Sequence, residues 1–273
     1  MSNREGAAGR MKTNVSMGSL LKSEGQRVFK RKRTGFVAAV YLIFVLLDCI
    51  FLTMTNTSFY DPGRSVPLDS LNAAPFLLRE LALLMNFVVI PMLAADSFGG
   101  DVSSGALRLV LIRPASRSRL FLAKWLVQGM LVGTLTLLTW GIGTAFGRIA
   151  MPHADRTTLM GAGTVGSGGA LLFTLGFYAV AFCIFLALIG VGGIVARIVP
   201  NPVLAYIGIL GVVVGGIYVS DRLAFLLSVS DSIFHFLGGD GGSDVSLGWI
   251  VCALLAGCVI IGTLSWRRRE WTQ

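Results

Sequence analysis

The stretch GALLFTLGFYAVAFCIFLALIGVGGIV, residues 169–195, contains no Asp, Glu, Lys or Arg over its whole length. A helix needs about 20 consecutive apolar residues to cross the roughly 30 Å hydrocarbon core of a bilayer. This stretch exceeds that minimum, so we expect a membrane-spanning helix that tilts or projects beyond the bilayer. A membrane should therefore organise the chain on either side of it.

The composition of the whole chain also favours a membrane protein. Of its 273 residues, 54% are hydrophobic and 14% are charged, whereas soluble domains are about one quarter charged. So few charged side chains cannot cover a globule of this size, and water is not the expected main solvent. The 34 glycines agree with this interpretation, because glycine is more frequent in membrane helices than in soluble ones.

Six stretches are long and apolar enough, or nearly so, to cross a bilayer. Pro200 and Pro202 separate the fourth stretch from the fifth, which is the shortest. The sequence thus predicts an all-α, polytopic membrane protein with a transmembrane domain over residues 35–266. The expected spans are residues 35–55, 76–95, 120–146, 169–195, 203–219 and 247–266.

The distribution of basic residues predicts the orientation of these spans. Eighteen of the 23 lysines and arginines lie in the two tails or in the second and fourth loop regions. Cytoplasmic loops carry the excess of Lys and Arg, so both chain ends are expected in the cytoplasm. The expected location is a bacterial plasma membrane, and the net charge of +9 follows from the topology.

Residues 1–34 and 267–273 form the predicted cytoplasmic tails. From Met17 the first tail is amphipathic: Met17, Leu20, Leu21 and Val28 share one face, while Glu24 and the basic residues lie elsewhere. Such a helix would lie in the membrane interface. The run Lys-Arg-Lys-Arg of residues 30–33 favours anchoring to anionic membrane lipid over nucleic-acid binding, which lacks a supporting fold or aromatic pattern.

The segment ADSFGGDVSSGALRLVLIRPASRSRLFLAKWL, residues 95–126, follows the second span. Asp101, Ser103 or Ser104 can cap a short helix that runs to about Ile112, and Pro114 cannot continue it. The pattern predicts a short helix on the cytoplasmic membrane surface between two spans. It could simply lie against lipid, or it could be a contact site for another protein.

This segment resembles the cytoplasmic loop of ABC-2 type transporter permeases. Asp101 stands where the family usually has glutamate, and Ala106 stands where it usually has threonine. The N-terminal amphipathic segment with Glu24 resembles the elbow helix of the family, and the layout of six spans with both ends inside also fits. The matching loop positions are Asp101, Gly105, Ala106, Leu107, Leu111, Pro114, Ser116, Arg117 and Lys124.

The resemblance implies that residues 101–112 are a coupling helix, which docks on a separate ATP-binding subunit and passes its closure to the spans. It further implies an exporter with two ATP-binding subunits and a second permease subunit, either identical or different. Arg108, Arg113 and Arg117 could pair with acidic groups on the partner. The implied coupling residues are Asp101, Gly105, Leu107, Arg108, Leu111, Pro114, Arg117 and Lys124.

The chain itself is not expected to be an enzyme. It lacks the P-loop pattern GxxxxGK[ST]; the glycine-rich GTVGSGG of residues 163–169 has no following lysine and indicates a flexible lead-in to the fourth span. ATP and Mg²⁺ would therefore bind to the partner subunit. The four cysteines lie in apolar runs without metal-ligand spacing, and His153 and His235 are far apart, so no metal or other cofactor is expected.

Three charged residues lie within or near the outer half of the first two spans. Asp48 is inside the first span, and Arg79 and Glu80 begin the second. A charge inside a membrane is costly and marks a functional hypothesis. We expect Asp48 to face Arg79 or a polar cavity on the substrate path, the alternatives being a structural ion pair or a protonated buried acid.

Residues 223–237 are apolar on one face and carry Ser228, Asp231 and His235 on the other. This pattern predicts an amphipathic helix on the outer surface or a shallow re-entrant hairpin. Among rival functions, an ATP-independent secondary carrier would show internal repeats and broken helices, and no convincing repeat is present. A membrane enzyme would need a cluster of catalytic groups, which the sequence does not provide.

Overall fold

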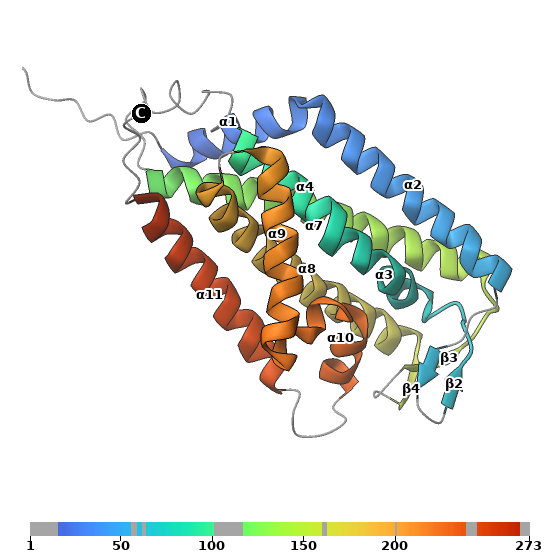
Figure 1. Ribbon diagram of the computed structural model, residues 1–273. Coiled ribbons are helices and arrows are strands. Elements are labelled where there is room, and N and C mark those ends of the chain that lie inside the picture. The colour runs from blue at the N-terminus through green and yellow to red at the C-terminus, as the bar shows by residue number, and fades with distance from the viewer. Residues whose placement is uncertain are drawn as a thin grey trace, which may run out of the picture.

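The computed structural model describes residues 16–55, 59–61, 64–100, 117–159, 163–199, 201–238 and 245–267. The chain is almost entirely helical, and within these residues six helices are long and apolar enough to cross a membrane. This confirms the predicted fold class, and each span begins and ends within about one helical turn of its predicted bounds. Figure 1 shows the long helices packed side by side.

The short first helix is followed by six spans, of which the second consists of four consecutive pieces. The helices are α1 (Met17–Lys30), α2 (Lys32–Thr55), α3 (Ala73–Leu84), η1 (Met85–Val89), α4 (Ile90–Ala94), η2 (Ala95–Gly99), α7 (Arg117–Ala150), α8 (Ser167–Ile198), α9 (Pro202–Val219), η3 (Asp221–Leu226), α10 (Val229–Gly238) and α11 (Val245–Arg267). The strands are β1 (Phe59–Asp61), β2 (Arg64–Val66), β3 (Arg156–Leu159) and β4 (Gly163–Gly166).

The spans run between two ends of the bundle, which we name the α1 end and the hairpin end (Figure 1). At the α1 end lie α1, η2, the start of α7, the start of α9 and the end of α11. At the hairpin end lie the strands, the start of α3, the start of α8 and α10. The described parts of both chain ends therefore lie at the same end of the bundle, as an even number of spans requires.

The second span is not a regular α-helix. Its pieces η1 and η2 are π-helical, and Pro91 lies between them. Proline has no backbone N–H, so the carbonyl four residues earlier loses its usual donor. That carbonyl belongs to Phe87, and it accepts a 3.0 Å hydrogen bond from the hydroxyl of Tyr206 on α9. A side chain from the fifth span thus satisfies the backbone group that the proline leaves open.

The fourth span, α8, is the central helix and packs closely through its glycines. A Cβ at Gly192 would lie 2.6 Å from the Cβ of Ala94 on α4, and one at Gly190 would lie 2.6 Å from the Cβ of Cys258 on α11. Small residues allow helix backbones to approach closely, and this close approach strengthens the van der Waals packing between helices in lipid. These glycines therefore set the position of α8 against its neighbours.

Two antiparallel hairpins at the hairpin end, β1–β2 and β3–β4, were not expected from the sequence. Residues 163–166, expected to be a flexible lead-in, form strand β4, and α8 begins directly after it at Ser167. Gly163 has a φ of +68°, a conformation that residues with a side chain rarely adopt. The prediction was therefore wrong for the first half of this glycine-rich stretch.

The α2, α9 and α11 helices expose large apolar side chains along much of their length. In the most apolar window of each, only 28%, 17% and 22% of the residues are buried, against 61–67% for the other three spans. Phe36, Phe51, Ile207 and Trp249 are each more than half exposed. These faces are suited to lipid or to another membrane-embedded chain.

We expect Gly192→Ala to destabilise the fold by about 1–3 kcal/mol, because the added methyl group overlaps Ala94 where neither group can turn away. The matched control is Gly211→Ala on α9, where a Cβ meets nothing within 4 Å. Thermal unfolding of both purified variants in the same detergent measures the difference. Equal unfolding temperatures for the two variants would contradict the close packing of α8 on α4.

Candidate functional site at the α1 end

The α1 helix lies against the α1 end of the bundle rather than extending away from it. Its first turn is capped by Ser16, whose hydroxyl accepts a 3.3 Å hydrogen bond from the backbone N–H of Ser19. Leu20, Glu24 and Val28 recur every four residues and are all buried, so they form the face that packs on the spans. Glu24 therefore lies on the buried face, and its expected position on the polar face was wrong.

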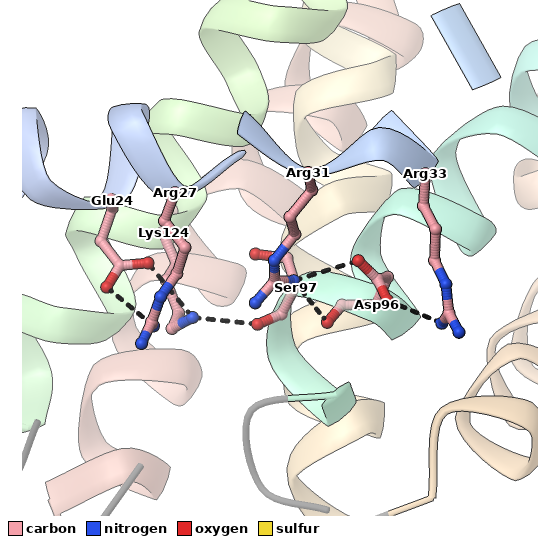
Figure 2. Close-up of polar contacts among 7 residues, drawn as sticks. All are labelled: Glu24, Arg27, Arg31, Arg33, Asp96, Ser97 and Lys124. Atoms are coloured by element: carbon pink, nitrogen blue, oxygen red, sulfur yellow. Dashed lines mark hydrogen bonds and ion pairs between the residues drawn. The ribbon is translucent and has the colours of Figure 1, made fainter. Parts of the chain in front are cut away.

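A buried ion pair holds α1 against the third span. The ammonium nitrogen of Lys124, on α7, lies 3.3 Å from Oε2 of Glu24, and the two side chains are only 1% and 5% exposed. Lys124 also donates a 2.9 Å hydrogen bond to the backbone carbonyl of Ser97 on η2. One side chain thus joins three helices (Figure 2). A buried charge is tolerated only when it is paired and hydrogen-bonded in this way.

A second set of contacts holds the junction of α1 and α2 to the second span. Arg31 donates hydrogen bonds to the carboxylate of Asp96 at 3.0 Å and to its backbone carbonyl at 3.1 Å. Arg33, at the start of α2, reaches the other carboxylate oxygen at 3.4 Å. Asp96 therefore lies between two guanidinium groups (Figure 2).

We name Glu24, Arg31, Arg33, Asp96, Ser97 and Lys124 the α1 brace. The brace contacts η2 at Asp96 and Ser97 and contacts α7 at Lys124. It therefore holds the two helix ends that flank the predicted coupling segment. The coupling residues Asp101, Gly105, Leu107, Arg108, Leu111 and Pro114 lie outside the described residues. Arg117 is the first residue of α7.

Aromatic packing adds the sixth span to the same end. The rings of Phe98, Phe121 and Trp266 form a triangle with centroid distances of 5.8, 5.9 and 6.1 Å. Ser118 also donates a 3.2 Å hydrogen bond to the carbonyl of Thr263 on α11. The ends of the second, third and sixth spans are therefore packed as one unit.

At the hairpin end, the three charged residues of the predicted substrate path do not pair with one another among the described residues. Nε of Arg79 lies 3.6 Å from Oδ1 of Asp231 on α10, so Arg79 pairs with Asp231 rather than Asp48, and the alternative that Asp48 faces a polar cavity stays a prediction. Asp48 lies beside the buried face of α2, and its Oδ2 is buried without a hydrogen-bond partner among the described residues. Glu80 is exposed. Arg79 instead ties the second span to the segment after the fifth.

That segment, η3 with α10, re-enters the bundle. The side-chain amide of Asn86 donates a 2.8 Å hydrogen bond to the carbonyl of Leu226, at the end of η3. Asn86 is 13 residues into the second span, about 20 Å from its start, so Leu226 lies deep within the membrane-spanning region. Phe234 of α10 packs on Phe177, with ring centroids 4.7 Å apart. The predicted outer segment is thus present as helix, and it reaches deeper than a surface helix would.

The sequence analysis did not identify Asp96 or Asn86 as contact residues, and it did not identify the buried ion pair of Lys124. A detectable signal existed for each, because a polar or charged residue in an apolar span must find a partner. The identity of the partner was not detectable, since Glu24 and Lys124 lie 100 residues apart in the chain. Among the described residues, no three His, Cys, Asp or Glu side chains gather as a metal site would require.

Comparison of the sequence with known protein families identifies the family of this chain. The chain matches the family described as "Protein of unknown function (DUF2705)" over residues 40–271, and it belongs to that family. It is also similar to the "Probable ABC transporter permease protein NosY" of Pseudomonas aeruginosa, with 26% identity over 152 residues. The alignment covers 56% of this chain and 54% of that relative, so the chain spans about half the length of the curated relative it matches.

We expect Lys124→Met to lower the free energy of unfolding by about 3–5 kcal/mol, because it leaves the Glu24 carboxylate buried without its buried cation and with only the partly exposed Arg27 beside it. The double variant Glu24→Leu with Lys124→Met should lose less than the sum of the two single variants, since it removes both charges. Denaturation in mixed micelles measures the free energy of unfolding of the two single variants and the double variant.

The control for this cycle is Arg27→Gln. Arg27 contacts Glu24 at 3.4 Å but is 30% exposed, so its loss should cost at most about 1 kcal/mol. If Lys124→Met were as stable as Arg27→Gln, the ion pair would not hold α1 in place.

We expect Asn86→Leu to loosen the re-entrant segment, because the buried carbonyl of Leu226 loses its donor at a cost of about 1–3 kcal/mol. Amide hydrogen exchange over residues 221–238 should become faster. Thr136→Val is the control: Thr136 is also buried, but its hydroxyl bonds to Val132 of its own helix. Unchanged exchange in Asn86→Leu would contradict the anchoring role of Asn86.

Proposed function

We propose that this chain is the permease subunit of an ABC exporter, in which a separate ATP-binding subunit supplies the energy. In this proposal the chain sits in a bacterial plasma membrane with the α1 end and both chain ends in the cytoplasm. It pairs with a second permease subunit, and two ATP-binding subunits dock below. The chain binds no nucleotide; ATP and Mg²⁺ belong to the partner.

The observation that carries the proposal is the α1 brace. A transporter driven by an external subunit needs a rigid connection between its docking segment and its spans. Here Lys124 fixes the start of α7 to α1, and Asp96 fixes η2 to the junction of α1 and α2, so both helix ends beside residues 101–116 are held. A displacement applied to those residues would therefore move α1, the end of the second span and the start of the third together. The similarity to a probable ABC transporter permease supports the same conclusion.

Within this proposal the implied coupling residues have two different roles. Asp101, Gly105, Leu107, Arg108, Leu111, Pro114 and Arg117 form or frame the docking segment. Lys124 is 1% exposed and is held by Glu24 and Ser97, so it acts as a positioning residue inside the permease. It holds the first turns of the third span, which follow the docking segment, to α1 and η2 without touching the ATP-binding subunit.

The proposed substrate path runs past the hairpin end, where Asp48, Arg79 and Glu80 remain its candidate residues. Arg79 contributes through Asp231, because their contact ties the second span to α10. Movement of the second span would then move the re-entrant segment that covers this end. Asp48 has one buried carboxylate oxygen without a partner among the described residues, and in this proposal a polar cargo supplies that partner once the spans move apart.

The alternative is an ATP-independent secondary carrier. One observation favours it: the second span is interrupted by two π-helical segments and Pro91, and carriers use discontinuous helices at their binding sites. A carrier would need no partner to move its cargo, and this difference separates the two functions by experiment.

Gentle purification of the tagged full-length chain should recover an ATPase with a P-loop in equal amounts. Arg108→Glu should reduce that recovery several-fold, because it reverses a charge on the docking segment. The control is Arg148→Glu, an exposed arginine at the hairpin end, which should leave recovery unchanged. Quantitative mass spectrometry of the purified material measures both.

Reconstituted liposomes then test the energy source. Transport that requires both the ATPase and ATP supports the permease. Transport by the chain alone, without nucleotide, would replace the proposal with the secondary carrier. Equal ATPase recovery with Arg108→Glu and Arg148→Glu would remove residues 101–112 as the docking segment.

A further inference from the structure

A groove of about 300 Å³ opens on the bundle surface at the α1 end, between α2, the end of the second span and the start of α9. Its residues come from the first two turns of α2 and α9, from α4 and from the first two residues of η2, so it lies near the α1 end of these spans. Residues that define it include Arg33, Val37, Leu93, Asp96, Val203 and Tyr206.

The wall of the groove is apolar below its mouth. Val37, Leu93 and Val203 contribute hydrocarbon surface. Tyr206 does not add a free polar group, because its hydroxyl donates to the carbonyl of Phe87. A polar or charged ligand would lose its hydration along this wall without gaining hydrogen bonds, whereas a hydrocarbon chain would lose nothing.

The mouth of the groove is basic. Arg33 lies there with its side chain 77% exposed, and one contact to Asp96 at 3.4 Å leaves most of its donors open to solvent. Asp96 is itself shared between Arg31 and Arg33, so this trio carries a net positive charge. Lys30 and Lys32 are exposed beside it. The mouth therefore attracts an anion at the level of the lipid head groups.

A basic mouth above an apolar wall is complementary to one kind of molecule, an anionic phospholipid. We propose that this groove binds one such lipid, with its phosphate at Arg33 and the upper part of an acyl chain against Val37, Leu93 and Val203. Arginine suits the phosphate because its planar group donates two parallel hydrogen bonds. The lipid would connect α2, the second span and α9 beside the α1 brace. This inference does not depend on the proposed transport function.

The purified full-length chain tests the proposal by native mass spectrometry and thermal unfolding with added phosphatidylglycerol or phosphatidylcholine. Phosphatidylglycerol should remain bound and raise the unfolding temperature more than phosphatidylcholine does. Arg33→Gln should remove that preference, because the phosphate loses its donor. Val203→Phe should reduce retention of both lipids, because the ring fills the groove.

Two matched controls separate the site from general effects. Arg119→Gln removes an exposed arginine on α7, and Val214→Phe enlarges a residue of α9 that is 40% exposed; neither residue is among those that line the groove. Both should bind lipid as the unchanged protein does. Inorganic phosphate at equal concentration should not reproduce the stabilisation.

Three results would overturn the proposal. The first is equal stabilisation by the two lipids, and the second is a preference that persists in Arg33→Gln as in Arg119→Gln. The third comes from a photocrosslinking amino acid placed at position 203: an adduct with a second copy of the chain, in place of an adduct with phosphatidylglycerol, would mean that protein covers the groove.

Discussion

The buried ammonium group of Lys124 is the constraint on which the α1 end depends. A charge with almost no access to water must be compensated within the protein, and here the partners are the Glu24 carboxylate and the Ser97 carbonyl. These groups belong to α1 and η2, whereas the lysine belongs to α7. Because none can move alone without leaving a buried charge less well compensated, the three segments keep one relative position.

The second span connects this constraint to the opposite end of the bundle. At the α1 end it supplies Asp96 and Ser97 to the brace; it supplies Arg79, near the hairpin end, and Asn86, at mid-span, to the re-entrant segment. In both places the second span holds a segment that does not itself cross the membrane. A single helix thus carries specific polar contacts at both ends, which is the physical basis for relating events on one side to events on the other.

The sequence predicts the spans well because length and absence of charge are local properties. It does not predict the pairings, because these depend on residues far apart in the chain. Glu24 was placed away from the apolar face on local amphipathicity, although it is buried beside Lys124. Arg79 was expected near Asp48, although α10 returns to place Asp231 beside it. The two hairpins were missed because strands of three or four residues carry too short a pattern for periodicity to detect.

The interruptions in the second span also change how that helix resists bending. A regular helix resists bending because every carbonyl is held by a donor one turn later. Around Pro91 that ladder is open, and Tyr206 supplies the missing donor from a different helix. The second span therefore has an interruption in its hydrogen-bond ladder about two-thirds of the way along, and the fifth span bridges this interruption through Tyr206. Any bending of the second span must first break or carry along that hydroxyl contact, which couples its flexure to the position of α9.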